Sequence, residues 1–330
     1  MGCNLCPRAC NVSRKGDDLG WCKSPWDITA ARAALHMWEE PVISGTCGSG
    51  TVFFSGCNLG CVFCQNRTIA KADRAKVISR DRLAEIFLML QEQGAHNINL
   101  VTGSHYIPQI ASALEKAKKE GLYIPVVYNT GGYDKVETLR MLEGLVDVWL
   151  PDLKYYDPDL SARYANAPDY FEVASRAIDE MVRQAGKTVF VKAAEDPQYQ
   201  KSLKLRRMYQ GPAALPDPVY DEGDEEEPLL LARKGVIVRH LLLPGQLKDS
   251  MKILGYLHEK YQDKIWVSIM NQYTPTGDLS AFPELTGRVL EADYDALVDY
   301  AIELGMEQAF IQDGETAEES FIPAFDYEGL

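Results

Sequence analysis

The chain reads Gly56-Cys57-Asn58-Leu59-Gly60-Cys61-Val62-Phe63-Cys64-Gln65-Asn66 at residues 56–66. Its three cysteines follow the pattern Cys-x3-Cys-x2-Cys, directly after an apolar, strand-like run at residues 51–55. Thiolates this close in a chain have a metal centre as their natural common partner, and three soft sulfurs suit iron–sulfur chemistry better than a hard cation. A four-iron cluster normally takes four protein thiolates, so a loop with three leaves one iron open to another ligand.

Two plainer interpretations of the same loop stay open. One is a structural zinc site that a distant fourth ligand completes. The other is an iron–sulfur cluster that only passes electrons. Both would make the chain a non-catalytic electron-transfer or structural module, and this is the alternative to an enzyme.

The loop resembles the signature of the radical S-adenosylmethionine (radical SAM) superfamily, which has an aromatic residue before its last cysteine, here Phe63. The resemblance implies that Cys57, Cys61 and Cys64 bind a [4Fe-4S] cluster and that S-adenosylmethionine (SAM) binds the open iron. It also implies an oxygen-sensitive enzyme that cleaves SAM reductively and abstracts hydrogen from a substrate. Phe63 is expected beside the cofactors.

Four further cysteines lie near the N-terminus with the spacing Cys-x2-Cys-x3-Cys-x11-Cys, namely Cys3, Cys6, Cys10 and Cys22. Residues 1–46 are predicted to form a four-cysteine metal-binding segment and a linker. The segment is too short to bury a core of its own, so a metal would supply much of its stability. Zinc and a second iron–sulfur cluster both suit four thiolates, and free thiols are the alternative. Cys47 has no local partner and is expected to be buried and inert.

Composition excludes some function classes. The chain has 34 basic and 48 acidic residues, a net charge of −14, which argues against nucleic acid as a partner. It has no apolar run long enough to cross a membrane and no signal peptide, so a cytoplasmic protein is expected. Eight cysteines in such a chain indicate metal ligands before disulfides. An electron donor of the flavodoxin or ferredoxin-like kind would need a local basic patch on this acidic protein.

From residue 51 onward, strand-like and helix-like patterns alternate. The strand-like runs are residues 51–55, 97–101, 124–129, 146–150, 236–243 and 265–269. The helical patterns are residues 79–93, 108–120, 135–142, 170–184, 247–261 and 291–304, and residues 308–312 could add a short strand. Such alternation predicts an α/β fold with parallel strands. The resemblance implies a partial (βα)6 TIM-like barrel over residues 47–312, with its site at the C-terminal strand ends.

Two segments depart from the alternation. Residues 187–232 are predicted to be an insertion, basic in its first part and acidic at residues 217–227. A solvated excursion is the first interpretation, and pairing of its halves or docking of a partner is the second. Residues 313–330, with Phe321, Pro323 and Phe325, are predicted to form a C-terminal strap packed on the barrel.

The run before the first strand and the loop after the second supply candidate site residues. His36, Glu39 and Glu40 could line a site, with packing as the alternative for His36. Many relatives have Gly-Gly-Glu after the second strand to receive the SAM amino group. Here Gly103, Ser104 and His105 stand in its place, with no glutamate, and backbone carbonyls near Gly103 are expected to take that role. His105 is a candidate substrate contact or proton donor, and a hydrogen-bonded structural histidine is the alternative.

The third and fourth strands end in Tyr128-Asn129-Thr130-Gly131 and Pro151-Asp152-Leu153-Lys154. These resemble the Asp-Thr-Asn-Gly and Asp-Leu-Lys motifs of glycyl-radical-enzyme activating enzymes, such as that for pyruvate formate-lyase. The resemblance implies that Asn129, Thr130 and Asp152 lie by the SAM carboxylate, with a bound monovalent cation. Asn129 replaces the usual aspartate and so removes one charge. Lys154 is placed to meet a carboxylate, and a surface ion pair with Asp152, worth little, is the alternative.

The fifth strand carries Arg239 before Pro244-Gly245, which matches the same family's arginine-containing strand. Arg239 is a candidate SAM contact, while His240 alternates to the opposite face of the strand. The chain therefore resembles a branch related to the pyruvate formate-lyase activating enzymes. Its substrate stays open between the glycine of a glycyl-radical enzyme, another protein or peptide, and a small molecule.

Overall fold

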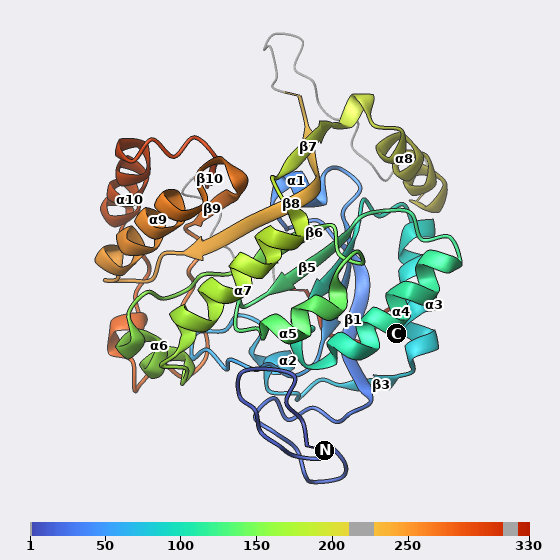
Figure 1. The fold of residues 1–330 in the computed structure, drawn as a ribbon, viewed down its shortest axis with the longest axis horizontal. Coiled ribbons are helices and arrows are strands. Elements are labelled where there is room, and N and C mark those ends of the chain that lie inside the picture. Colours follow the sequence, from blue (N-terminus) through green and yellow to red (C-terminus); the bar gives the residue numbers. More distant parts are fainter. Residues whose placement is uncertain (1, 211–227, 313–322) are drawn as a thin grey trace.

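The computed structural model describes residues 2–210, 228–312 and 323–330, and the fold is built on one large sheet (Figure 1). The acidic run 217–227 and Phe321 lie outside these residues. Over the described ranges the sheet has ten strands in the order β10-β9-β8-β6-β5-β4-β2-β1-β3, with β7 paired to β8. The strands are β1 (Ile28–His36), β2 (Ser49–Phe54), β3 (Lys76–Ile78), β4 (Ile98–Val101), β5 (Val126–Thr130), β6 (Val148–Pro151), β7 (Val189–Lys192), β8 (Leu230–Leu241), β9 (Trp266–Met270) and β10 (Ala309–Ile311).

Along the sheet, β2, β4, β5, β6, β8, β9 and β10 follow one another in this order, and each is parallel to the next. This confirms the predicted α/β fold with a parallel sheet. The six predicted strand-like runs correspond to β2, β4, β5, β6, β8 and β9, and residues 308–312 contain β10. The strands β2, β4 and β5 are buried along their whole length, which explains why most of their residues are apolar, since helices cover one face and the site lies on the other.

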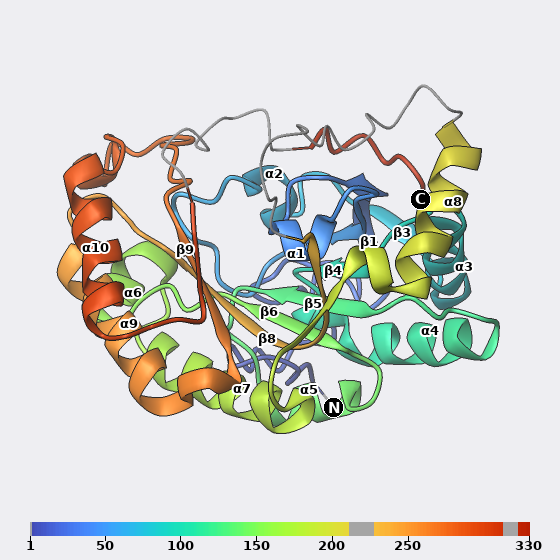
Figure 2. The same ribbon diagram turned by 90° about the horizontal axis from the view of Figure 1, so that it is seen from above.

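The helices lie along the convex outer side of the curved sheet (Figure 2). The principal ones are α3 (Arg80–Glu92), α4 (Ile107–Lys119), α5 (Val136–Leu139), α6 (Pro158–Ala165), α7 (Tyr170–Ala185), α9 (Leu247–Tyr261) and α10 (Glu291–Glu303). Helix α3 shows why they form: the Ser79 hydroxyl accepts a hydrogen bond from the Arg82 amide at its start. Leu83, Phe87 and Leu90 then recur on its buried face.

Strands β1 and β3 were not predicted: β1 runs antiparallel beside β2, and β3 runs antiparallel beside β1 at the edge of the sheet. The sequence of β1 is rich in alanine, a residue that is uncommon in strands. Ala30, Ala31 and Ala33 are fully buried there, because small side chains let neighbouring segments approach closely. Tertiary packing therefore decides this strand, while local preference does not.

The insertion is ordered where the structure describes it. Strand β7 pairs with the first part of β8, and α8 (Pro197–Gln210) packs beside α3. The Ser202 hydroxyl donates to the Ala95 carbonyl at 3.0 Å, and the Tyr199 ring stacks on His96. Residues 187–210 thus pack on the body of the molecule through a few buried side chains, among them Ala193 and Tyr199, while most of their other side chains are exposed or half-buried, and a solvated excursion stays a prediction for the whole insertion.

The C-terminal residues 323–330 lie along β1. The Ala33 amide donates to the Glu328 carbonyl at 2.8 Å, and Arg32 forms ion pairs with Asp326 and Glu328. Phe325 packs edge-on against Phe53 of β2, with ring centroids 5.5 Å apart. This segment thus closes the sheet on the side of β1 and β2.

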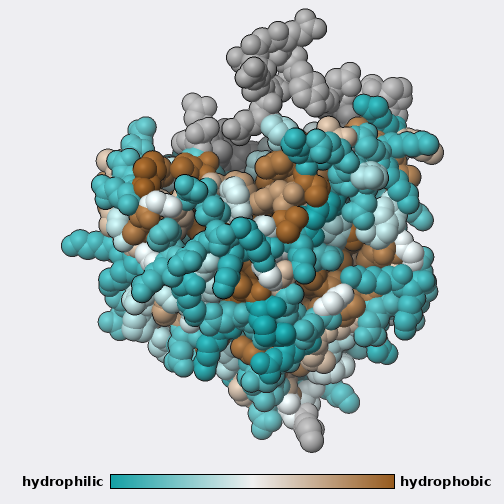
Figure 3. Space-filling view, turned by 45° about the horizontal axis from the view of Figure 1, so that its top comes forward, coloured by the Kyte–Doolittle hydropathy of each residue, from teal (hydrophilic) through white to brown (hydrophobic). Residues whose placement is uncertain are grey.

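The face of the molecule in Figure 3 is mostly hydrophilic, with apolar side chains gathered in separate patches. Within the described ranges, no helix combines the length and the apolar composition needed to cross a membrane.

Candidate metal and cofactor site

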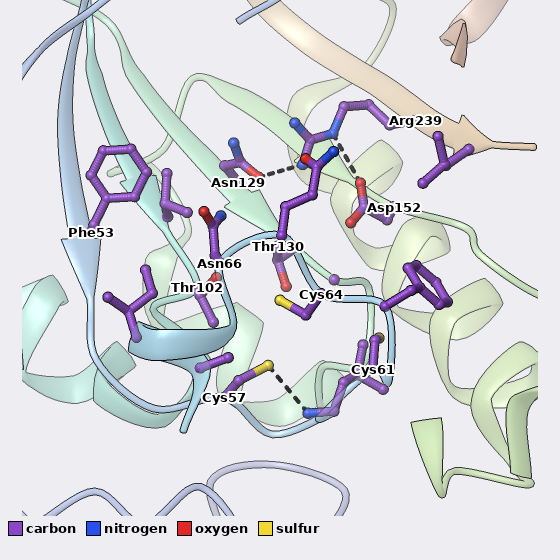
Figure 4. A pocket seen from close by; sticks show the side chains of 18 of the residues that line it. Phe53, Cys57, Cys61, Cys64, Asn66, Thr102, Asn129, Thr130, Asp152 and Arg239 are labelled. Carbon is purple, nitrogen blue, oxygen red and sulfur yellow. Dashed lines mark hydrogen bonds and ion pairs between the residues drawn. The ribbon is translucent and has the colours of Figure 1, made fainter. Parts of the chain in front are cut away.

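A cavity of about 270 Å³ lies where the parallel strands end (Figure 4). Its lining includes residues at or just after the ends of β2, β4, β5, β6, β8 and β9, in order Gly56, Thr102, Thr130, Asp152, Leu241 and Met270. His36, Trp38 and Glu39, at and just after the end of β1, complete one wall. In a parallel sheet these carboxyl ends meet at one edge, which is where α/β barrels place their sites.

Cys57, Cys61 and Cys64 all line this cavity, and Asn129, Asp152 and Arg239 lie across it from them (Figure 4). Burial raises the pKa of the Cys61 thiol to about 11 and that of Cys64 to about 12, while the nearby Lys154 ammonium acts to lower both. The two thiols are therefore protonated at neutral pH. A metal centre would have to displace these protons, since the thiolate is the ligand.

The chemistry of this donor set fits an iron–sulfur cluster. Three thiols share one cavity, and the pKa of Cys64 is raised in part by Cys61 and Cys57, so the three are neighbours. In the residues that the structure describes, no three His, Cys, Asp or Glu side chains are drawn together into a formed metal-binding group. The fit thus rests on three soft sulfur donors that face one cavity beside the Lys154 ammonium.

Asp152 and Lys154 form the ion pair that the sequence offered as an alternative, but the pair is not at the surface. The Lys154 ammonium lies 2.6 Å from one Asp152 oxygen, and the Arg239 Nε lies 2.9 Å from the other. Both side chains of the Asp152–Lys154 pair are less than a fifth exposed and line the cavity. Burial alone would raise the pKa of Asp152, but the two cations more than offset it, so its pKa lies below the usual value.

Arg239 connects this pair to Glu39. Its Nη2 donates to the Asn129 side-chain oxygen at 2.6 Å, and its Nη1 lies 3.5 Å from a Glu39 oxygen. Asn99 also donates to Glu39, at 2.9 Å. Burial raises the pKa of Glu39 and the Arg239 cation opposes this rise. Glu39 was a candidate from the sequence, but its partners lie between 60 and 200 residues away.

Thr130 and Phe63 also line the cavity. The Thr130 hydroxyl donates to the buried Asp134 at 2.5 Å. The Phe63 ring packs edge-on against Tyr273, with ring centroids 5.9 Å apart. The sequence gave no reason to select Asp134. The one feature that could have pointed to it is that it follows Thr130 by four residues.

The sequence of this region matches a known protein family. Residues 51–192 match the model of the radical SAM superfamily. The chain carries a radical SAM domain. Radical SAM enzymes are catalysts that use a [4Fe-4S] cluster and SAM, and the three cavity thiols of the matched region suit such a cluster.

The relatives of this radical SAM domain are remote. "Uncharacterized protein MJ0674" of Methanocaldococcus jannaschii is 25% identical over 306 residues, which cover 91% of this chain and 74% of the relative. Streptococcus suis SuiB, solved with its precursor peptide SuiA, matches with 12% identity and a TM-score of 0.44, covering 78% of this chain. A radical SAM methyltransferase from Sphaerobacter thermophilus matches with 14% identity and a TM-score of 0.46, covering 79% of this chain and 65% of its own. The chain spans 46% of the SuiB chain.

Three predicted site residues of the radical SAM domain lie outside the cavity lining, namely Gly103, Ser104 and His105. A single 3-10 turn, η1 (Ser104–Tyr106), follows β4 and turns them away. Gly103 packs against Phe54 and Ile110, and the Ser104 hydroxyl accepts from Tyr128. None of the three lines the cavity, and their contact with the cofactors or substrate stays a prediction.

Thr102 is the residue of this loop that does reach the cavity. Its φ of +60° places a β-branched side chain in the left-handed region, which is a strained conformation. Its amide donates to the Asn129 carbonyl at 2.9 Å. No pattern in the sequence marks such a backbone conformation at a threonine.

His105 has the structural role that the sequence offered as its alternative. Its Nε2 lies 2.8 Å from the Ser55 carbonyl, and its own carbonyl accepts from Arg14 at 2.6 Å. Burial lowers the pKa of His105 to about 3, so the ring is neutral at physiological pH. It braces the segment that leads from β2 into the cysteine loop.

His105→Phe is expected to lower the free energy of unfolding by about 1–3 kcal/mol, because the buried Ser55 carbonyl loses one of its two donors, the other being the Ser24 hydroxyl, and the larger phenyl ring must fit the same buried space. Chemical denaturation measures this loss. His258→Phe, at a half-exposed site on α9, is the control and should change stability little. A catalytic His105 would instead give a variant with parental stability and no turnover.

The four N-terminal cysteines belong to the segment drawn in dark blue at the bottom of Figure 1. Cys6 and Cys22 are buried, and Cys3 and Cys10 are half-buried. Burial raises the pKa of Cys6 to about 12, and Cys22, Cys10 and Cys3 each add to this rise, so the four thiols are neighbours. Cys47 is fully buried elsewhere, and burial raises its pKa to about 11.

Proposed function

We propose that this chain is a radical SAM enzyme in which Cys57, Cys61 and Cys64 hold the cluster and SAM occupies the adjoining cavity. The observation that carries the proposal is that these three thiols share one cavity with the charged groups of Asp152, Lys154 and Arg239. When bound and reduced, the cluster supplies an electron that cleaves SAM, and the resulting 5'-deoxyadenosyl radical removes hydrogen from a substrate.

Each polar or charged side chain that lines this wall of the cavity has a role in the proposal. The Lys154 ammonium has three donors and gives one to Asp152, so it can meet the carboxylate of SAM with another. Asn129, Thr130 and Thr102 offer polar groups along the same wall. Arg239 holds Asn129 and Asp152 in place. Phe63 contributes an apolar face beside the cysteines.

Asp152 acts through its two cationic neighbours. Each of its oxygens already accepts from a protein cation, Lys154 on one side and Arg239 on the other. Its charge is thus neutralised from within the chain, and Asn129 brings no further charge. A monovalent cation beside Asp152 is therefore left out of the proposal.

We propose that the substrate is a small molecule, in preference to a protein loop such as that of a glycyl-radical enzyme. The support is the wall on the side of β2, where Pro323 lines the cavity and Phe325 packs on Phe53. An activase would need an open face to admit a folded partner, and this side is covered by the C-terminal segment and β1.

Reductive cleavage of SAM tests the function. The full chain, reconstituted with iron and sulfide under anaerobic conditions, is expected to form 5'-deoxyadenosine when SAM and dithionite are added. Dithionite replaces the proposed flavodoxin or ferredoxin-like donor. Deuterium transferred into 5'-deoxyadenosine from a deuterated small-molecule extract would support the proposed substrate class. A reconstituted protein that forms no 5'-deoxyadenosine would favour the non-catalytic module.

We also propose that Cys3, Cys6, Cys10 and Cys22 bind a metal of their own. A variant with Cys57, Cys61 and Cys64 all replaced by alanine is expected to retain about one zinc per chain, since four thiolates complete a tetrahedral structural site. Elemental analysis of the purified variant measures this. About four residual irons would mean a second cluster in place of zinc, and neither metal would mean free thiols.

A further inference from the structure

Arg8 lies between Cys6 and Cys10 and makes four hydrogen bonds, all to backbone carbonyls. Two acceptors, Ala165 and Asn166, lie at the C-terminal end of helix α6. The other two, Asn58 at 2.8 Å and Leu59 at 3.1 Å, belong to the cysteine loop. Among the ion pairs of the described residues, none involves Arg8. All four hydrogen bonds of the Arg8 guanidinium therefore go to the backbone, and none goes to a carboxylate.

Trp21, next to Cys22, adds a second donor to the same loop. Its Nε1 donates to the Leu59 carbonyl at 3.1 Å. Its ring also lies under the Arg8 guanidinium, 4.1 Å from the ring centroid, which keeps the guanidinium plane in place. Gly60, at a φ of +83°, completes the turn beside this ring. The N-terminal segment thus contacts the loop between Cys57 and Cys61 through two donors.

The peptide group between Asn58 and Leu59 links Arg8 to Cys57. Its carbonyl accepts from Arg8, and its N–H, on Leu59, donates to the Cys57 sulfur at 3.4 Å (Figure 4). A peptide group is planar, so an anchor on the carbonyl fixes the direction of the N–H. A cation on the carbonyl also polarises the amide and strengthens its N–H as a donor.

We propose that Arg8 is a positioning residue for the cluster: it orients and polarises the 58–59 peptide so that an N–H is held against the Cys57 sulfur. Hydrogen bonds to cluster sulfurs help to set the reduction potential, and one to Cys57 stabilises the more negative, reduced state. This inference rests on the proposed function in one respect, that Cys57 is a cluster ligand. Cys6 and Cys10 flank Arg8, so the N-terminal segment carries both this donor and the proposed second metal site.

The test is an anaerobic redox titration of the reconstituted full chain, followed by the EPR signal of the reduced cluster without SAM. Arg8→Met, which keeps an unbranched stem without donors, is expected to shift the reduction potential to a more negative value. Arg8→Lys, which keeps the charge but loses the planar fork, should fall between this variant and the parent. Trp21→Phe should give a smaller shift, and Arg176→Met, exposed on α7, none.

Hydrogen exchange of the Leu59 amide gives a second readout that needs no cluster. In the metal-free full chain, Arg8→Met is expected to exchange this amide about tenfold faster, the equivalent of losing one ordinary hydrogen bond. If Arg8→Met does not fold, Arg8→Lys and Trp21→Phe carry the same comparison. An unchanged potential together with unchanged exchange would overturn the inference. A parent chain that protects Leu59 but loads no cluster on Cys57, Cys61 and Cys64 would instead overturn the proposed function.

Discussion

Cys61→Ala is expected to reduce both cluster retention and 5'-deoxyadenosine formation to background. The cavity offers three thiols, and loss of one leaves two where a site-differentiated four-iron cluster needs three. The lining also contains the imidazole of His36 and the thioether of Met270. They lie at the ends of β1 and β9, outside the cysteine loop, which makes them poor replacements. Iron analysis and product chromatography measure the two losses.

Cys47→Ala is the matched control for this variant. Cys47 is also a buried cysteine with a raised pKa, but it does not line the cavity. Its replacement is expected to keep the iron content and the rate of SAM cleavage, with a modest loss of stability from the lost side chain. A Cys61→Ala protein with parental iron and parental activity would contradict the assignment of the loop as the cluster site.

The elements that could be predicted are those with a local signal. The apolar runs of β4, β5 and β9 alternate with amphipathic helices, and that period alone defines the parallel sheet. The spacing of Cys57, Cys61 and Cys64 within one loop likewise indicates a shared metal without any knowledge of the fold.

The rest of the site depends on contacts that a local pattern does not contain. Glu39 contacts Asn99, Asn129 and Arg239 only because β1 pairs with β2. This pairing places the segment just after β1, which carries Glu39, at the ends of the parallel strands. The sequence left His105 open between a substrate contact and a structural residue, because its direction is set by one turn of 3-10 helix after β4, which no residue type announces.

The Arg8 contacts show the same limit in a different way. The sequence predicts that Cys6 and Cys10 bind a metal, but it gives the residue between them no role. Four carbonyls, two from the cysteine loop and two from the C-terminal end of α6, become acceptors for Arg8 only when the N-terminal segment lies against the cysteine loop. A backbone acceptor carries no side-chain identity, so this kind of contact leaves no trace in residue type.

Arg239→Met is expected to lower the free energy of unfolding by about 3–5 kcal/mol, because it leaves Glu39 buried without its cation and Asp152 with one partner in place of two. All three side chains are less than a fifth exposed, so water screens the lost charge poorly. Denaturant unfolding at pH 8 measures the loss. Arg183→Met is the control: Arg183 also pairs with two carboxylates but is half-exposed, and about 1 kcal/mol or less is expected.

The pH dependence of the Arg239→Met loss separates its electrostatic cause from lost packing. Burial already raises the pKa of Glu39, and without the Arg239 cation this pKa rises further. The folded state then binds a proton that the unfolded state has released, so stability falls as pH rises between the unfolded and folded pKa values. The loss should therefore be smaller at pH 5 than at pH 8. It should also be partly restored at pH 8 by adding Glu39→Gln, which removes the unpaired charge and keeps an acceptor for Asn99. A loss that is equal at both pH values and unaffected by Glu39→Gln would mean that Arg239 stabilises the cavity wall by packing alone.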